Sequence, residues 1–436
     1  MTDSSLVARD LQHIWHPCSQ MKDYELFHPL IITGASKAYL HLQDGRKIID
    51  AISSWWCKSL GHQHPRLKRA LQLQMDKFEH VILANTTNET IVQLSEKLTE
   101  LSPSLNKVMY ASDGSSAVEM AMKMSLHARV IEGKTQRKLF IALENSYHGE
   151  TIATLSVSDL GLYSEPYRSL MFAVKKIAPP YVNGEDDARW DNCELHWQSV
   201  LEQLQPYAHT ATALIVEPIL QAAAGMQIYS RDFLRRLRQW TREHDIHLIA
   251  DEIMTGIGRT GKMLACEHAG IEADFVCLSK GLTSGWLPLS AMLTRNDIYD
   301  LFYDDYANGK SFMHSHTHSG NVLAASVALE TLNIMTEEKL CARAGEMGGV
   351  MLEAMQAIAN HTGKLKNIRM LGAMVAADLI CDTNKRYGYE VYRKAVELGA
   401  LLRPLGNTIY WVPPLNTEWE TLCELKNITQ KAILME

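Results

Sequence analysis

One acidic and one basic residue, each at the end of a short apolar run, form the most informative pair in the chain. Asp251 closes the run His247–Asp251, and Lys280 follows the run Phe275–Leu278. Because the carboxyl ends of parallel strands open into a shared crevice, we expect both side chains at one ligand. A lysine amine that condenses with an aldehyde, facing a carboxylate that keeps a pyridine nitrogen protonated, is the pair that pyridoxal phosphate chemistry needs.

Each of these two residues also has an ordinary structural interpretation. An Asp-Glu pair after a strand is a common metal-binding or helix-capping arrangement, and a single lysine is usually solvated. The glycines between Leu248 and Ser290 surround both residues and favour the chemical interpretation.

A third group of small polar residues lies between an apolar run and a predicted helix. Asp113–Ser116 follows the run Lys107–Ala111 and precedes a helix expected over Ala117–Val130. Free backbone N–H groups and hydroxyls at such a position suit a phosphate. Without the lysine motif, a simple helix cap explains the same residues better.

The elements that must position these residues alternate between short apolar runs and amphipathic stretches. This alternation predicts an α/β fold with a mainly parallel sheet. Ser230–His244 is expected to form a crossover helix with Ser230 as its N-cap. The predicted strands of this part are Lys107–Ala111, Leu139–Leu143, Ala213–Glu217, His247–Asp251 and Phe275–Leu278.

The pattern changes after Asn321 and predicts a second, smaller α+β domain. Two long helices, over Val322–Met335 and Leu340–Ala359, precede strands over Met374–Leu379 and Ile409–Pro413. The expected domains are an N-terminal segment that joins the small domain and the pocket (1–60), a large cofactor-binding domain (61–325) and a small C-terminal domain (326–436).

Composition excludes several classes of function. With 46% hydrophobic residues, 21% charged residues and a net charge of −7, the 436-residue chain is globular and has no basic arm for nucleic acid. No apolar stretch approaches the roughly 20 residues of a membrane span, and Met1–Asp10 has no export signal. The eight cysteines form no C-x-x-C pair, which favours reduced thiols and a cytoplasmic location.

The stretch from Leu248 to Ser290 resembles the signature of the class III pyridoxal phosphate aminotransferases. Segments around Asp113–Ser116, Asn145–Glu150 and Val216–Pro218 match the same family in chain order. The resemblance implies a fold-type I transferase, with pyridoxal phosphate as cofactor and amino transfer as activity. It implies a catalytic set of Lys280, Asp251 and Tyr147, and a cofactor set of Gly114, Ser115, Tyr147 stacked on the ring, Glu217, Asp251, Lys280 and Thr317.

Two further motifs resemble the branch of this family that acts in biotin biosynthesis. His13–Pro17 and the paired Trp55 and Trp56 match this branch, and two indoles suit a long aliphatic substrate. If the tryptophans lay in a strand, only one would face the pocket. Arg403 resembles the arginine that pairs with the substrate carboxylate, and Tyr410 is a weaker pocket candidate.

The segment Phe312–Asn321 resembles a loop that reaches the cofactor phosphate of a partner subunit. Thr317 takes the hydroxyl position and Ser315 is a substrate-site candidate, so the resemblance implies a homodimer with composite sites. The three histidines of this segment also suggest a metal, but no nearby Cys or Asp completes a ligand set.

Some positions depart from the branch pattern and leave alternatives open. Cys18 replaces a tyrosine and Glu150 replaces an aspartate. His-Ser-His-Thr at 314–317 replaces a His-Gly-Pro-Thr sequence, so His316 stands in the place of the proline. Lys280–Pro288 resembles a Bacillus-type branch, part of which takes its amino group from lysine, so S-adenosylmethionine and lysine are both candidate donors. An ω-amino acid or polyamine aminotransferase, an isomerase or decarboxylase on the same scaffold, and a non-catalytic protein are the rival functions.

Overall fold

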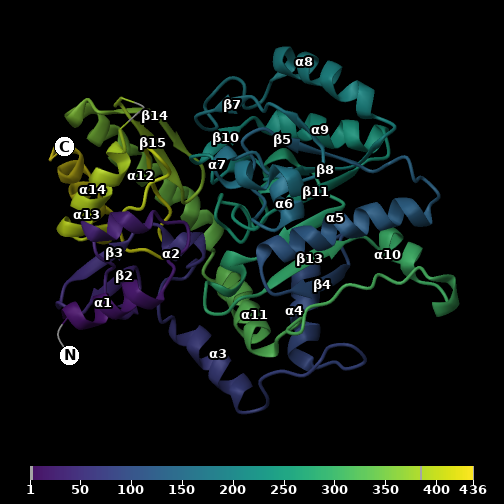
Figure 1. Ribbon diagram of the computed structural model, residues 1–436, viewed down its shortest axis with the longest axis horizontal. Coiled ribbons are helices and arrows are strands. Elements are labelled where there is room, and N and C mark those ends of the chain that lie inside the picture. Colours follow the sequence, from purple (N-terminus) through teal and green to yellow (C-terminus); the bar gives the residue numbers. More distant parts are fainter. Residues whose placement is uncertain (1–2, 383–384, 436) are drawn as a thin grey trace.

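A seven-stranded sheet forms the centre of the computed structural model, which describes residues 3–382 and 385–435 (Figure 1). Neighbouring strands from β12 to β6 run parallel, whereas β13 runs antiparallel to both of its neighbours. All five predicted strands of this part are present, and the predicted mainly parallel α/β fold is confirmed. In spatial order the strands are β4 (Lys107–Ala111), β13 (Ser290–Thr294), β12 (Phe275–Leu278), β11 (His247–Asp251), β8 (Ala211–Val216), β5 (Leu139–Leu143) and β6 (Val174–Ile177).

Alternate residues of the central strands pack into two different apolar clusters, one on each face of the sheet. Leu248 and Ala250 of β11 belong to the cluster that contains helix α9 (Arg231–Glu243), whereas Ile249 belongs to the cluster that contains helix α5 (Gly114–Ile131). This period of two follows from the pleat of a strand. Helices therefore cover both faces, as a parallel sheet requires.

The predicted starts of the two helices next to the central sheet, α9 and α5, differ in accuracy. Ser230 caps α9 as predicted, because its side chain accepts a hydrogen bond from the N–H of Phe233. Helix α5 begins at Gly114, three residues before the predicted start at Ala117. The reason is that Asp113 caps this helix and its Oδ1 accepts from the N–H of Ser116 at 3.0 Å.

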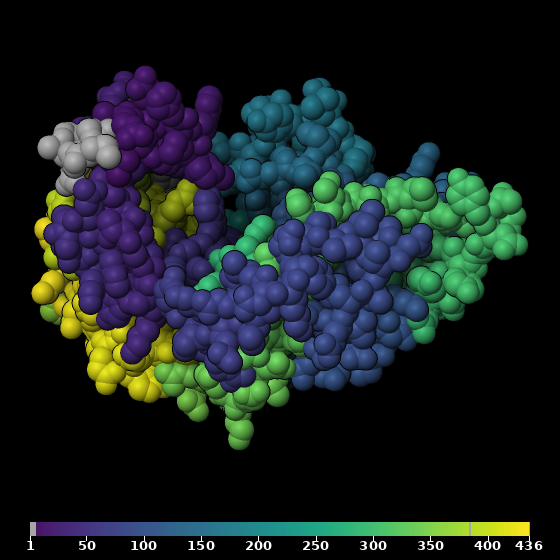
Figure 2. Space-filling view, turned by 90° about the horizontal axis from the view of Figure 1, so that it is seen from below, coloured from purple at the N-terminus to yellow at the C-terminus, as the bar shows by residue number. Residues whose placement is uncertain are grey.

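The N-terminal and C-terminal parts of the chain share one sheet. Strand β3 (Lys47–Asp50) pairs in parallel with β16 (Ala400–Leu401) beside β1 (Ile32–Ser36) and β2 (Tyr39–Leu42). Figure 2 shows the N-terminal residues in purple against the C-terminal residues in yellow, with a hollow between them. This pairing brings the first residues of the chain beside the segment that contains Arg403.

A second antiparallel sheet and two long helices complete the C-terminal part. The predicted helices and strands of this part are present with ends shifted by at most a few residues. The exact division into domains at residues 60 and 325 stays a prediction. The elements are α11 (Val322–Glu337), α12 (Leu340–Thr362), β14 (Leu365–Met370), β15 (Val375–Leu379), α13 (Tyr387–Leu398), β17 (Thr408–Trp411) and α14 (Trp419–Leu434).

Shorter elements connect these layers. No helix within residues 3–382 and 385–435 combines the length and the apolar character that a membrane span needs. The remaining elements are α1 (Asp3–His13), η1 (Met21–Glu25), α2 (Ser53–Trp56), α3 (Pro65–Met75), α4 (Glu89–Thr99), α6 (Ile152–Val157), α7 (Gly161–Ser164), η2 (Glu165–Leu170), β7 (Tyr181–Val182), α8 (Glu194–Leu204), η3 (Gln205–Tyr207), β9 (Leu220–Gln221), β10 (Gln227–Tyr229), η4 (Ala265–Ala269), η5 (Lys280–Thr283), α10 (Asn296–Phe302) and η6 (Tyr306–Asn308).

Candidate active site

A cavity of about 410 Å³ lies at the carboxyl ends of the central parallel strands. Its volume falls in the roughly 300–1,000 Å³ range of small-molecule sites. Most of the residues predicted for the site line this one cavity, although they come from distant parts of the sequence. The predicted residues that line it are Trp55, Trp56, Gly114, Ser115, Tyr147, Glu217, Asp251, Lys280 and Arg403.

Lys280 begins η5 directly after β12 and extends its amine into the cavity. Its Nζ lies 4.7 Å from the centre of the Trp56 ring. Burial lowers the pKa of the Lys280 amine, and the negative charges of Asp251 and Glu217 only partly oppose this shift. A lowered pKa favours the neutral amine, which is the form that attacks a carbonyl and accepts a proton.

Gly281 allows the chain after Lys280 to approach another segment closely. A Cβ atom at this position would lie 2.7 Å from the Oγ of Ser59, which is closer than real Cβ contacts. The Ser59 hydroxyl donates to the Gly281 carbonyl at 3.3 Å. The glycine therefore fixes the backbone that carries the lysine.

Asp251, His148 and Glu217 form a buried polar group on the same wall of the cavity. One oxygen of Asp251 lies 2.8 Å from Nδ1 of His148, and the other accepts from the N–H of Ile253 at 3.1 Å. Glu217 accepts from the N–H groups of Tyr147 and Ala222 at 2.9 and 3.1 Å.

Burial and charge in this group shift the pKa of Glu217. The pKa of the Glu217 carboxyl is raised to about 7, chiefly by burial; His148 opposes this shift and the charge of Asp251 adds to it. His148 was only part of a motif in the sequence, with no role assigned to it. Its position in the Tyr-His-Gly motif was the signal, but only the fold brings it to Asp251.

The N-terminus of helix α5 faces the cavity through Gly114 and Ser115. The first N–H groups of a helix lack partners within the helix and attract anions. A Cβ at Gly114 would lie 2.8 Å from the side chain of Ile253, and one at Gly149 would lie 2.1 Å from the Oγ of Ser115. The two glycines therefore allow the side chains of Ile253 and Ser115 to pack closely at the start of α5.

Trp55 and Trp56 lie in a left-handed turn, not in a strand. All four residues from Ser53 to Trp56 have positive φ, between 45° and 75°. As a result, both indoles line the cavity, and the expectation that a strand would turn one of them away does not apply. The side chain of Asp50 holds the turn, because it accepts from the N–H and the hydroxyl of Ser54 at 2.9 and 2.6 Å.

Arg403 and Tyr410 occupy different positions relative to the two tryptophans. The guanidinium of Arg403 lies 4.5 Å from the centre of the Trp55 ring and donates to the carbonyl of Cys18 at 2.6 Å. Tyr410 was predicted to line the cavity, but it does not. It is buried behind Trp56 and accepts a hydrogen bond from that indole at 3.1 Å, so it orients the tryptophan instead of touching a ligand.

Cys18 and Glu150, two of the residues that differ from the branch pattern, lie together at the rim of the cavity. Glu150 accepts from the hydroxyl of Tyr147 at 2.8 Å, and the Cys18 thiol lies 3.9 Å from the same carboxylate oxygen. Tyr163 also lines the cavity, with its ring 5.9 Å from that of Tyr147, although no motif in the sequence marks it. A phenol is therefore present beside Cys18.

Ser315 and Thr317 are not brought to this cavity within the chain. Both are exposed on the loop before α11. The carbonyl of Thr317 lies 3.0 Å from Nε2 of His80, and Ser315 faces a separate hollow. Among residues 3–382 and 385–435, no group of three or more His, Cys, Asp or Glu side chains is arranged to hold a metal.

Comparison with known proteins decides the family. The family model described as "Aminotransferase class-III" matches residues 20–433. The chain is a class III aminotransferase. Class III aminotransferases carry out amino transfer with pyridoxal phosphate, so the cofactor predicted from the Asp251 and Lys280 pair and the activity implied by the family resemblance are confirmed.

Relatives of this class III aminotransferase include adenosylmethionine-8-amino-7-oxononanoate aminotransferases from several organisms. The Helicobacter pylori protein is 39% identical over 414 residues, which cover 94% of this chain and 93% of the relative. The solved structure of the Methanocaldococcus jannaschii enzyme of the same name has a TM-score of 0.93 at 31% identity, and it covers 100% of this chain and 99% of its own. A thermostable omega transaminase mutant from Pseudomonas jessenii has a TM-score of 0.90 at 27% identity, covering 99% of this chain and 98% of its own.

The residues of this class III aminotransferase fit pyridoxal phosphate. Lys280 lies on the cavity for the aldehyde, and the start of α5 lies on it for the phosphate. Asp251 is only 4% exposed but lines the cavity, with His148 behind it, so its carboxylate would face the ring nitrogen of the cofactor and favour the protonated form. The volume, the donors and the charges therefore agree with this cofactor.

Proposed function

We propose that this class III aminotransferase converts 8-amino-7-oxononanoate to 7,8-diaminononanoate in biotin biosynthesis, with S-adenosylmethionine as the amino donor. The observation that carries the proposal is one cavity that combines Lys280, Asp251, two indoles and an arginine. The substrate is a linear chain with a keto group near one end and a carboxylate at the other. Such a chain needs an amine near the keto group, an apolar wall along the aliphatic carbons and a cation near the carboxylate. The names of the relatives support the same substrates.

In this proposal each residue of the cavity has a separate role in the reaction. Bound pyridoxal phosphate supplies the electron-withdrawing ring through which the amino group passes from donor to acceptor. Lys280 Nζ would move the proton of the donor's amino-bearing carbon to the bound cofactor, and in the second half-reaction it would move a proton from the cofactor to the carbon of the acceptor that receives the amino group. The Asp251 carboxylate provides the buried negative charge, and the rings of Trp55 and Trp56 exclude water from the aliphatic chain.

Arg403 is proposed to bind the carboxylate of the acceptor. Arg403→Leu is expected to raise KM for 8-amino-7-oxononanoate by about 10–150-fold, because a hydrogen bond to a charged group contributes about 1.5–3 kcal/mol. Initial rates over a range of acceptor concentrations measure this change. Arg403→Lys, which keeps the charge but not the planar fork, is the matched variant and is expected to recover part of the loss. An unchanged KM in Arg403→Leu contradicts the assignment.

The function is tested by separating the two half-reactions. Protein loaded with pyridoxal phosphate receives S-adenosylmethionine or lysine in parallel, and absorbance follows conversion to the pyridoxamine form. We expect S-adenosylmethionine to convert it, and subsequent 8-amino-7-oxononanoate to reverse the change with release of 7,8-diaminononanoate, detected by mass spectrometry. Conversion by lysine alone contradicts the proposed donor, and a protein that never aminates 8-amino-7-oxononanoate contradicts the proposed function.

A second candidate function is an ω-amino acid or polyamine aminotransferase. Its support is the likeness to solved omega transaminases, which reach TM-scores of 0.90. The same spectral experiment separates the two, because an ω-amine donor would then convert the cofactor and 8-amino-7-oxononanoate would not restore it.

We further propose a homodimer in which the loop of Ser315 and Thr317 reaches the phosphate site of the partner subunit. The exposure of both residues on a loop outside their own cavity supports this arrangement. We also propose a cytoplasmic location. All eight cysteines are free, which suits a reducing compartment.

A further inference from the structure

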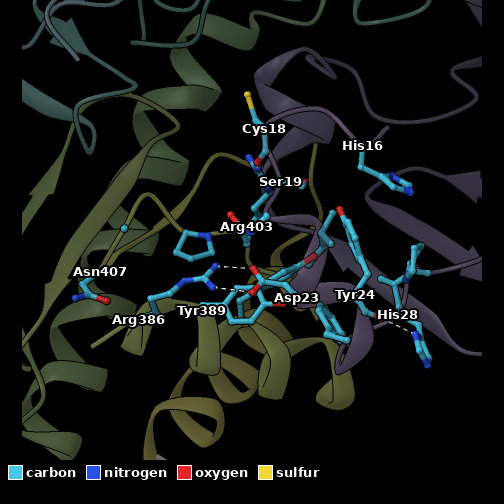
Figure 3. Close-up of a pocket in the computed structure, with 18 of the residues that line it drawn as sticks. His16, Cys18, Ser19, Asp23, Tyr24, His28, Arg386, Tyr389, Arg403 and Asn407 are labelled. Atoms are coloured by element: carbon cyan, nitrogen blue, oxygen red, sulfur yellow. Dashed lines mark hydrogen bonds and ion pairs between the residues drawn. The ribbon is translucent and has the colours of Figure 1, made fainter. Parts of the chain in front are cut away.

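A second cavity, of about 600 Å³, adjoins the cavity that contains Lys280. It lies between residues 16–40 and residues 385–407, and Figure 3 shows it between these two segments. Cys18 and Arg403 line both cavities, and the hydrogen bond from Arg403 to the Cys18 carbonyl joins their walls. A ligand larger than one cavity therefore has room to extend past Arg403 into the other.

Aromatic rings provide much of the surface of the second cavity. The ring of Phe27 packs edge-on against Tyr392 and Tyr389, with centres 5.4 and 6.4 Å apart, and Tyr24 packs on the other side against His16. These contacts hold the rings in place before any ligand arrives. Rigid aromatic walls with hydroxyl groups at their edges suit a planar heterocycle with an attached sugar.

Charged side chains also line the second cavity, among them Lys385, Arg386 and Arg403. Arg386 forms a two-pronged ion pair with Asp23, with both distances 2.8 Å, as the dashed lines in Figure 3 show. The guanidinium of Arg386 also lies 4.4 Å from the centre of the Tyr389 ring. The ion pair and the ring contact hold Arg386, so this part of the cavity offers a fixed polar edge beside the aromatic rings.

We infer that the second cavity binds the adenosyl group of the amino donor while the amino end of the same molecule reaches Lys280. This inference rests on the proposed function. The acceptor is a linear chain whose ends are assigned to Lys280 and Arg403 in the first cavity. No part of the acceptor is therefore expected to enter the second cavity. The donor carries a nucleoside on a short chain, and its sulfonium then lies near the rim, where Glu150 supplies a carboxylate. Lysine has no group that would fill the second cavity.

A side chain that fills the second cavity tests this inference. Ser19 lines this cavity but not the first, and it is partly buried, whereas Lys22 is exposed nearby and lines neither. Ser19→Trp is expected to lower kcat/KM for S-adenosylmethionine at least about tenfold, the size of effect that pocket shape commonly gives. Lys22→Trp is the matched control and is expected to retain the wild-type value. Neither variant is expected to change KM for 8-amino-7-oxononanoate more than about twofold.

Binding of adenosine alone gives a measurement that does not depend on turnover. Calorimetry on the cofactor-loaded wild-type protein is expected to show adenosine binding, and kinetics are expected to show competition with S-adenosylmethionine. Ser19→Ala, which leaves the cavity open, should bind adenosine as the wild type does, whereas Ser19→Trp should not. This comparison remains informative if the tryptophan variant folds poorly.

Two results would overturn the inference. The first is an equal kcat/KM for S-adenosylmethionine in Ser19→Trp and Lys22→Trp, and the second is the absence of adenosine binding to the wild type. The amination of 8-amino-7-oxononanoate by the pyridoxamine-loaded enzyme is measured in the same series. If this step occurs, only the donor site is wrong; if it fails in the wild type, the proposed function itself is wrong.

Discussion

Lys280→Ala is expected to lower the rate of amino transfer by about 10⁴-fold or more, because it removes the amine that we propose both binds the cofactor aldehyde and transfers the proton. A positioned proton-transfer group alone contributes roughly 10²–10⁴-fold. Loss of the covalent attachment adds to this effect. Stopped-flow absorbance of the donor half-reaction measures the rate directly, without the second substrate.

A neighbouring lysine provides the control for this substitution. Lys58 donates to the carbonyl of Gly285 at 2.9 Å and does not line the cavity. Lys58→Ala removes a similar side chain close to the site, and it is expected to retain turnover within a few-fold. An added small primary amine is expected to restore part of the rate in Lys280→Ala only. Near-normal turnover of Lys280→Ala without that amine contradicts the assignment.

Asp251→Asn is expected to lower turnover by about 10²–10³-fold, the cost of removing one preorganised electrostatic group from an active site. The amide keeps the shape of the carboxylate but not its charge. It therefore no longer favours a protonated ring nitrogen, and the ring withdraws electrons less strongly. Single-turnover absorbance measures the rate, and the pH dependence of the bound cofactor's spectrum reports the loss of charge at the ring.

A purely structural role for Asp251 predicts a different outcome. The side chain is buried and contacts His148 and the N–H of Ile253, so its replacement also changes local packing. Thermal unfolding of the variant is therefore measured in parallel. A large loss of stability with an unchanged cofactor spectrum would show that Asp251 holds the wall together and does not act on the cofactor.

Local sequence patterns were enough to predict the central strands and the residues at their ends. Short runs such as His247–Asp251 are fully buried, so their apolar character marks them without knowledge of their neighbours. Ser230 and α9 follow from local capping and period. The positions of Asp251 and Lys280 at one cavity then follow from the rule that parallel strands open at their carboxyl ends.

Other features depend on contacts between distant residues and could not be predicted from local sequence patterns. The left-handed turn of Trp55 and Trp56, the place of Tyr410 behind Trp56 and the bond from His148 to Asp251 have no periodic signal in the sequence. The second cavity exists because β3 pairs with β16 and brings Cys18 to Arg403, 385 residues further along the chain. Local conformational preference depends on a few neighbouring residues. The packing of an apolar face, in contrast, depends on segments that can lie anywhere in the chain.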